Sequence, residues 1–383
     1  MGWCTTADLD KFVAAAGGYL RSTAVENTLL LSAAQAARSA WDPRIAGRPP
    51  GTARPPATGA QPGMGAPPPG SSLLFGWWEP PDGSEPRGAF LHDPAVPLLI
   101  AGRAPEMAAA LAGTLAKMGR PVTGVDGPVQ AADAFAAAWS HREGVSIRMH
   151  KQCRVYRLAG GPDGMGPDGM GAAGGASGAT WAAAGPAGRL RVATGADRAL
   201  LADWLTAFAA EAAERIGSAQ AMADDLIGYG GAVFWESPQR PARVRDAITW
   251  DTGAPNGETG YQPVAMAALT RPVAGTVRMS VVYTAPDRRR NGYAAALMYA
   301  ASRAVLDGVA PRAEPGAGPR AGSQVVMITD TNRPNRGVAR LGYQLVGERT
   351  VLRFGPPTGP LPGVRTTGPM PRLPTGPLPR TRR

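Results

Sequence analysis

Apolar positions gather in two long stretches of the chain, residues 5–158 and 189–355. Apolar residues that recur every three or four positions predict amphipathic helices, whereas alternation or a short apolar run predicts a strand. In the first stretch these patterns predict one or two helices over 8–38, further helices over 106–118 and 129–139, and strands over 73–78, 96–102 and 145–158. The mixture of the two element types predicts an α/β fold.

The second stretch contains a similar mixture. Leu200, Trp204 and Phe208 recur at helical spacing, which predicts a helix over 197–215 with Trp204 and Phe208 in the core. The remaining patterns predict strands over 189–194, 230–237, 264–270, 277–284, 323–330 and 343–354, and helices over 292–306 and 335–341. The order of these elements predicts an α+β arrangement around one mixed sheet.

Segments rich in Pro and Gly separate the two stretches. Fifteen of the thirty residues in 43–72 are Pro or Gly, a composition typical of a flexible insertion. Residues 159–188 are rich in Gly and Ala and have few charges, as in a flexible linker. We therefore predict an N-terminal domain (1–158, with the insertion at 43–72), a linker (159–188), a C-terminal domain (189–355) and a disordered Pro/Arg tail (356–383).

The positive charge is unevenly distributed. The formal net charge is +11, and the only lysines are Lys11, Lys117 and Lys151, so nearly all the basic residues are Arg. The tail holds five Arg and no acidic residue, which predicts weak contact with polyanions through the tail. The composition does not indicate a DNA-binding body.

The cysteines and the apolar runs indicate the cellular compartment of the protein. Cys4 and Cys153 lie far apart without metal-ligand spacing, which is typical of a reducing compartment and predicts no metal site. No apolar run reaches the length of a membrane span, and Asp8, Asp10 and Lys11 stand where a signal peptide would need an apolar core. We predict a cytoplasmic protein without membrane contact.

The segment 284–297, TAPDRRRNGYAAAL, combines a strand end, a Pro, three Arg and a Gly before an Ala-rich helix. The amides at such a helix start have no partner within the helix and attract anions. Gly292 allows close approach of the backbone, and Arg288, Arg289 and Arg290 add positive charge. These features predict a diphosphate site between a strand and a helix.

Two common phosphate motifs are absent from this segment. No Gly-Lys-Ser/Thr follows the loop, and the spacing Gly-x-Gly-x-x-Gly is missing. The spacing Arg289-x-x-Gly292-x-Ala294 instead resembles the acetyl-CoA pyrophosphate motif of the GNAT family of N-acetyltransferases. Residues 281–302 and 326–348 resemble that family's central strand, cofactor helix, next strand and terminal Gly-Tyr, so the likeness spans 189–355.

The resemblance implies the GNAT acyl-CoA N-acyltransferase fold and acetyl-CoA as the acyl donor, with no metal. The acceptor would be a small-molecule or peptide amine that attacks the thioester directly in a ternary complex. The backbone of Val282, Tyr283 and Thr284 would pair with the pantetheine arm, and Asn332 would contact the cofactor. The pyrophosphate would lie on the amides of the following loop, namely Arg289, Arg290, Asn291, Gly292, Tyr293 and Ala294.

The sequence departs from the family pattern at three places. Val338 stands where such enzymes often carry the Tyr that protonates the departing thiolate, and Arg290 replaces the first Gly of the loop. The strand 277–284 lacks a carboxylate, so Asp330 and Glu236 are the nearest candidates for the general base by strand position, and Asp330 is chosen. The alternative to an enzyme is a catalytically silent acyl-CoA-binding protein with a regulatory or scaffold role.

The first stretch resembles the N-terminal half of two-domain members of this family. It lacks the pyrophosphate spacing after a strand, which implies a degenerate GNAT-like domain that shapes the acceptor cleft or stabilises the pair. An internal pair of similar units can replace a homodimer, so a monomer is expected.

Overall fold

The computed structural model describes residues 2–41, 73–80, 82–159, 185–214, 216–238, 243–244, 247–248, 260–309, 311, 323–332 and 336–357. The insertion predicted at 43–72 lies wholly outside these residues, as do most of the predicted linker and most of the predicted tail.

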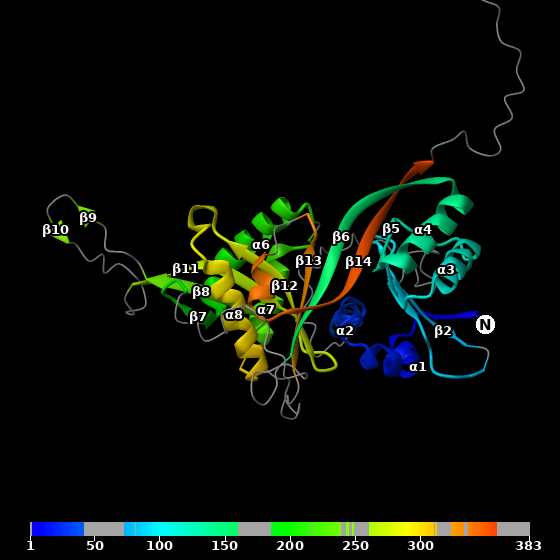
Figure 1. Ribbon diagram of the computed structural model, residues 1–383, viewed down its shortest axis with the longest axis horizontal. Helices are drawn as coiled ribbons and strands as arrows, with labels where there is room; N and C mark the ends of the chain where they lie inside the picture. Colours follow the sequence, from blue (N-terminus) through cyan, green and yellow to red (C-terminus); the bar gives the residue numbers. More distant parts are fainter. Residues whose placement is uncertain are drawn as a thin grey trace, which may run out of the picture.

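One twelve-stranded mixed sheet runs through the described part of the chain, with helices packed against it (Figure 1). The predicted mixed α/β fold is therefore confirmed. The strand order is β1-β2-β3-β4-β5-β14-β6-β13-β12-β11-β8-β7.

The N-terminal half contributes six strands and four helices. Their bounds are β1 Gly2–Thr6, α1 Leu9–Ser22, α2 Thr28–Trp41, β2 Leu74–Glu79, β3 Ala89–His92, β4 Leu98–Ala101, α3 Pro105–Lys117, β5 Gly124–Pro128, α4 Val129–Glu143 and β6 Val145–Ala159. Of these, β1, β3 and β5 have four or five residues and were not predicted from the hydrophobic pattern.

The C-terminal half repeats the same order of elements. Its main elements are β7 Arg189–Val192, α6 Arg198–Ala212, α7 Ala219–Tyr229, β8 Ala232–Pro238, β11 Tyr261–Leu269, β12 Thr276–Thr284, α8 Tyr293–Leu306, β13 Gln324–Asp330, α9 Arg336–Arg340 and β14 Gln344–Pro357. Two 3-10 turns, η1 Gly195–Asp197 and η2 Pro286–Arg288, and a small hairpin of β9 Arg243–Val244 with β10 Ala247–Ile248 complete it. The repeated order confirms the prediction of two tandem units of one fold.

The two halves exchange their last strands. Strand β14 lies between β5 and β6, and β6 lies between β14 and β13, so the two long strands cross the centre of the molecule together (Figure 1). The exchange extends to the cores, because Tyr156 of β6 packs in the C-terminal core and Leu352 of β14 packs in the N-terminal core. Each half therefore completes the other, and the boundaries predicted at 158 and 355 divide the sequence without dividing the sheet.

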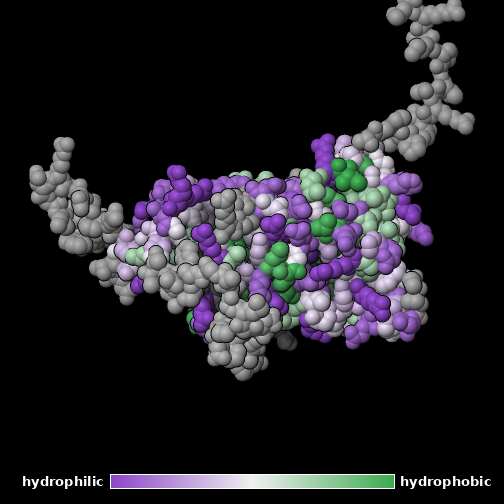
Figure 2. All heavy atoms as spheres, in the orientation of Figure 1, coloured by the Kyte–Doolittle hydropathy of each residue, from purple (hydrophilic) through white to green (hydrophobic). Residues whose placement is uncertain are grey.

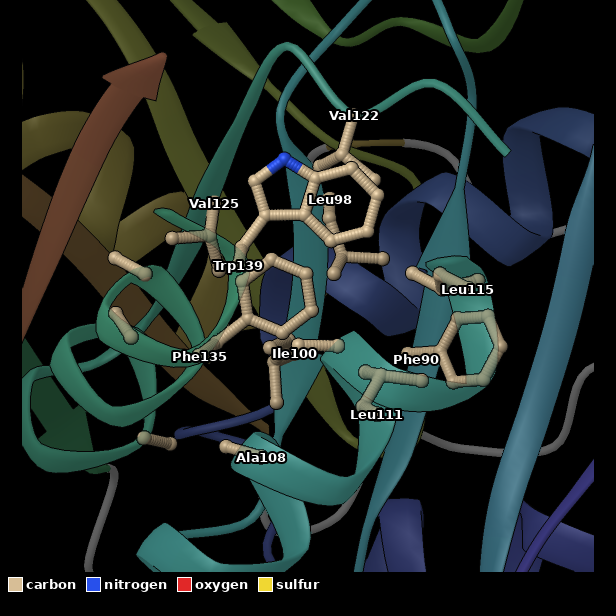
Figure 3. Packing of buried hydrophobic residues seen from close by; sticks show 14 of the residues in the cluster. Phe90, Leu98, Ile100, Ala108, Leu111, Leu115, Val122, Val125, Phe135 and Trp139 are labelled. Carbon is tan, nitrogen blue, oxygen red and sulfur yellow. The ribbon is translucent and has the colours of Figure 1, made fainter. Parts of the chain in front are cut away.

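Helices cover both faces of the sheet. In the N-terminal half, Phe135 and Trp139 of α4 stack in a core that α3 and the inner strands close (Figure 3). In the C-terminal half, alternation along β11 separates two layers, since Ala265 and Ala267 face α8 whereas Met266 and Ala268 face α6 and α7. The outer surface in Figure 2 is a mixture of hydrophilic and hydrophobic areas.

One expectation about helices needs correction. The predicted helix 197–215 is shorter, because α6 ends at Ala212 where Ala213 adopts a left-handed conformation. The segment 8–38, for which one or two helices were predicted, forms two, α1 and α2. The fully buried face of α6 carries Leu201 and Leu205, whereas Trp204 and Phe208 are only partly buried.

Within the described ranges, no helix is long and apolar enough to cross a membrane. The same ranges contain no group of three or more His, Cys, Asp or Glu side chains that would hold a metal ion. Cys4 and Cys153 are both free.

Candidate active site

A β-bulge in β12 opens the sheet. Ala268 of β11 pairs with Val281, but its neighbour Leu269 pairs with Met279, so Ser280 is an extra residue on β12. A bulge of this kind bends its strand and interrupts the ladder. The parallel pairing of β12 with β13 ends at the same level, with Met279 opposite Met327. Beyond this point the two strands have no paired residues, and a gap opens between them.

A cavity of about 370 Å³ occupies this gap. One end is lined by Phe208, Ala212 and Glu214, from α6 and the residues after it. The other end is lined by residues of α8 and α9, among them Ala294 and Val338. Because α6 and α8 cover opposite faces of the sheet, the cavity passes from one face to the other between the separated strands.

Backbone groups of β12 face this gap. The amide of Ala285 donates to the carbonyl oxygen of Val264 on β11 at 3.1 Å. Backbone groups of an antiparallel pair point toward the partner strand at every second residue. Val282 and Thr284 therefore present their N–H and C=O groups to the gap, as an added extended chain would require. Tyr283 does not, because its backbone faces β11 and its buried ring packs against Trp204 of α6.

The predicted phosphate loop leads from β12 to α8. Eight residues separate the two elements, and Gly292 at the end of the loop has φ +80°, a conformation that side chains other than Gly rarely adopt. Among the described residues, no side chain caps the N-terminus of α8, so its first amides are not occupied in that way. Only Pro186 lies near Gly292, 3.6 Å from where a Cβ would be.

The side chains of Arg289 and Asn291 in the loop form hydrogen bonds with other groups of the protein. The guanidinium of Arg289 donates to Glu211 at 2.7 Å and to the Thr284 carbonyl oxygen at 3.1 Å. The Asn291 amide donates to two loop carbonyl oxygens, of Arg288 and Arg289, at 3.0 and 3.2 Å. These bonds hold the loop in place, and they leave the Arg289 guanidinium in an ion pair with Glu211.

Arg290 and Tyr293 have different roles from each other. Arg290 is exposed and has φ +66°, which explains why a Gly suits this position better than an Arg. The Tyr293 hydroxyl lies 3.1 Å from the Ser237 hydroxyl of β8, so the Tyr293 side chain packs toward β8. Only the backbone of Tyr293 can therefore contribute to an anion site at the start of α8.

Asp330 lines the cavity at the end of β13, whereas Asn332 does not line it. The Asp330 carboxylate accepts the backbone amide of Asn332 at 2.9 Å, which closes a local turn. The structure therefore brings Val282, Ala294 and Asp330 together around one cavity, and leaves Asn332 exposed beside it.

Val338 lies where the resemblance places a Tyr. Its side chain is 4% exposed and lines the cavity, and this position offers no proton donor. The nearby Tyr343 cannot take over, because its buried hydroxyl is 2.7 Å from the Ser302 hydroxyl, away from the cavity lining.

Sequence reasoning missed several residues that line the cavity. Lys151 comes from β6 in the N-terminal half, and its ammonium lies 2.6 Å from the Glu214 carboxylate. The Thr329 hydroxyl is buried without a hydrogen-bond partner at the same cavity. Phe208, expected to be in the core only, also lines it. The strand exchange brings Lys151 here, and no local pattern in the sequence indicates that exchange.

The described residues of the N-terminal half are arranged differently at the corresponding place. Only three residues connect β4 to α3, against eight between β12 and α8, so no extended loop precedes the helix. A smaller cavity of about 240 Å³ lies here, lined in part by Glu26, Arg103 and Arg349. Ion pairs join Arg103 to Glu26 and Arg349 to Asp126, so charged side chains fill this region.

Neither a protein-family model nor a curated protein matches the sequence significantly. Solved structures to which the chain is similar include a GCN5-related N-acetyltransferase from Sphaerobacter thermophilus, with 14% identity over 74% of this chain and 80% of that chain and a TM-score of 0.43. An acetyltransferase from the GNAT family of Colwellia psychrerythraea has 9% identity over 74% and 85%, with a TM-score of 0.42. A tandem GNAT protein from the clavulanic acid biosynthesis pathway has 16% identity over 76% and 84%, with a TM-score of 0.37. At these TM-scores the neighbours carry no argument about the function of this chain.

Proposed function

We propose that the chain is an acetyl-CoA-dependent N-acetyltransferase that moves an acetyl group to a primary amine by direct attack in a ternary complex. The observation that carries this proposal is the gap between β12 and β13, which joins a cavity through the sheet to the uncapped N-terminus of α8. A thioester and an amine can enter such a cavity from opposite faces.

The residues present fit the acyl donor. The N–H and C=O groups of Val282 and the N–H group of Thr284 suit the amides of a pantetheine arm, whereas the Thr284 carbonyl oxygen accepts from Arg289. The start of α8, with Gly292 at positive φ, suits the pyrophosphate. The buried Thr329 hydroxyl, which lacks a partner, would find one in a bound ligand.

The reaction needs proximity and proton transfer. The amine nitrogen attacks the thioester carbonyl carbon, a C–N bond forms, and the C–S bond breaks to release the thiolate. Asp330 at the cavity edge would accept the proton that the amine loses. The backbone N–H of Val282 faces the gap and would stabilise the oxyanion. The protein is expected to act in the cytoplasm as a monomer, and its Arg/Pro tail is expected to bind polyanions weakly.

Val338 favours a second candidate function. A buried apolar side chain stands where a proton donor is expected, which suits a catalytically silent acyl-CoA-binding protein with a regulatory or scaffold role. Turnover separates the two candidates, since both of them bind the donor.

The first test is calorimetry with acetyl-CoA on the wild type, Gly292→Glu and Gly292→Ala. Both variants force a side chain into φ +80°, but only Glu adds bulk and negative charge where the pyrophosphate would lie. We expect binding by the wild type, weaker binding by Gly292→Ala, and loss of binding in Gly292→Glu. Equal affinity of the two variants would contradict the phosphate site.

The second test measures release of free thiol from acetyl-CoA in the presence of spermidine, an aminoglycoside, an amino acid and a lysine-containing peptide. Thiol release that depends on one of these amines, with the acetylated amine found by mass spectrometry, supports the enzyme. Tight binding of acetyl-CoA without turnover of any of them supports the silent alternative.

A further inference from the structure

We propose that Lys151 is the general acid that protonates the departing thiolate, the role that Val338 cannot perform. This inference rests on the function proposed above. It assigns a catalytic residue of the C-terminal cavity to a strand of the N-terminal half.

The position of Lys151 supports this role. Lys151 lines the same cavity as Asp330 and Val338, and its ammonium lies beside Glu214. It reaches the cavity because β6 lies directly beside β13, where Asp330 pairs with Cys153, two residues from Lys151. The Lys151 side chain is 16% exposed, and its ammonium is held by the ion pair with Glu214.

The chain has a Lys rather than an Arg at position 151, and the two residue types differ in their ability to release a proton. The other two lysines of the chain, Lys11 and Lys117, are exposed, and nearly all other basic positions are Arg. An Arg would form the ion pair with Glu214 at least as well, but its guanidinium does not give up its proton in proteins. A Lys ammonium can release a proton to a thiolate and recover it from solvent. Among the described residues that line this cavity, Lys151 is the largely buried cation, and its ammonium is able to exchange protons.

The proton balance closes without another reactant. The attacking amine loses one proton to Asp330 or water, and the thiolate gains one from the Lys151 ammonium. Lys151 then recovers a proton from solvent, so the sum is amine plus acetyl-CoA giving amide plus free thiol. Glu214, 2.6 Å from the ammonium, positions Lys151.

Other titratable groups surround Lys151 and would contribute to a pH profile. They are Glu214 after α6, Asp330 on β13, His150 and Cys153 on β6 itself, and Arg353 on β14 near His150. The test therefore compares variants rather than reading one titration.

The experiment compares the wild type with Lys151→Arg and Lys151→Met in the full chain, with Lys117→Arg as the exposed control. Acetyl-CoA affinity is measured by calorimetry, and kcat is measured from pH 6 to 10 with the best amine of the panel above. For Lys151→Arg we expect kcat to fall by about 10²-fold, within the usual range for loss of a general acid, with the acetyl-CoA Kd unchanged. The pH profile of kcat should also differ between the wild type and Lys151→Arg, because an Arg guanidinium keeps its proton.

The outcomes separate the two proposals. A wild type without turnover removes the proposed function and this inference together. A wild type with turnover, and Lys151→Arg with the same kcat and the same pH profile, overturns the inference alone. Equal thermal unfolding of Lys151→Arg and the wild type excludes misfolding, and Lys151→Met, which removes the charge and the proton, should lose at least as much activity.

Discussion

The carboxylate of Asp126 on β5 and the guanidinium of Arg349 on β14, 223 positions apart in the sequence, form an ion pair at 2.8 Å. The Arg349 side chain is 6% exposed and that of Asp126 is 17% exposed. The pair lies where the C-terminal strand enters the N-terminal half, and Arg349 also lines the 240 Å³ cavity there.

Removal of one partner should destabilise the protein more than removal of both. Arg349→Met leaves the Asp126 carboxylate buried without its cation, which typically costs about 3–5 kcal/mol. The double variant Asp126→Leu/Arg349→Met leaves no unpaired charge and should lose less free energy of unfolding than Arg349→Met alone. Urea unfolding measures both, and a double variant that is less stable than Arg349→Met would contradict the argument.

The strand exchange predicts that neither half folds alone. Residues 1–184 without β14 would leave β5 and β6 without the strand between them, and residues 185–383 without β6 would expose the edge of β13. Each half expressed separately should aggregate, and the two expressed together should copurify as a 1:1 complex. A soluble, monomeric C-terminal half with cooperative unfolding would show that the exchanged strand is dispensable.

The individual elements of the fold were predictable, but the exchange was not. Local periodicity predicted α8, β12 and β13 to within a few residues, and the loop residues Gly292 and Ala294 lie at the start of α8 as expected. The pairing of β6 with β13 depends on contacts between distant segments, which leave no local pattern. For the same reason Lys151 and Glu214 could not be assigned to the cavity from the sequence.

Arg290→Gly should stabilise the protein. Arg290 has φ +66°, and a left-handed conformation costs a residue with a side chain about 1–2 kcal/mol. Gly removes that cost but adds entropy to the unfolded chain, so the expected net gain is about 0.5–1 kcal/mol. Chemical unfolding measures the change.

A matched control for this variant is Ala213→Gly at the end of α6, where φ is +52°. It should give a similar gain in stability without any change in acetyl-CoA affinity, because Ala213 lies outside the loop. A loss of stability in Arg290→Gly would show that the Arg side chain contributes more than its strained backbone costs.

His92 should make stability depend on pH. Its side chain is fully buried and its Nε2 lies 2.9 Å from the Pro121 carbonyl oxygen. Burial lowers the pKa of His92 below its usual value of 6.5, although the bond to Pro121 partly opposes the shift. The unfolded chain therefore binds a proton first, so the stabilising contribution is complete above pH 6.5 and declines as the pH falls below it.

The measurement is the unfolding free energy between pH 8 and 5 for the wild type, His92→Gln and the exposed control His141→Gln. Gln can still donate to Pro121 but does not titrate in this range, so His92→Gln should be less sensitive to pH than the wild type and His141→Gln should match the wild type. Equal slopes in all three proteins would assign the pH dependence to other groups.

Val338→Tyr should compensate for the loss of Lys151. The Val338 side chain borders the 370 Å³ cavity, which leaves room for a phenol that points toward the gap. If Lys151 is the proton donor, a hydroxyl at position 338 offers a second donor. The double variant Lys151→Arg/Val338→Tyr should therefore have a kcat at least about tenfold higher than that of Lys151→Arg, which is a modest share of what general acid catalysis supplies.

The control is Val338→Phe in the same Lys151→Arg background. Phe has nearly the same bulk as Tyr but no hydroxyl, so this variant should recover no activity. Recovery by Phe as well as Tyr would attribute the gain to packing, and recovery by neither would mean that a proton at this position does not reach the leaving thiolate.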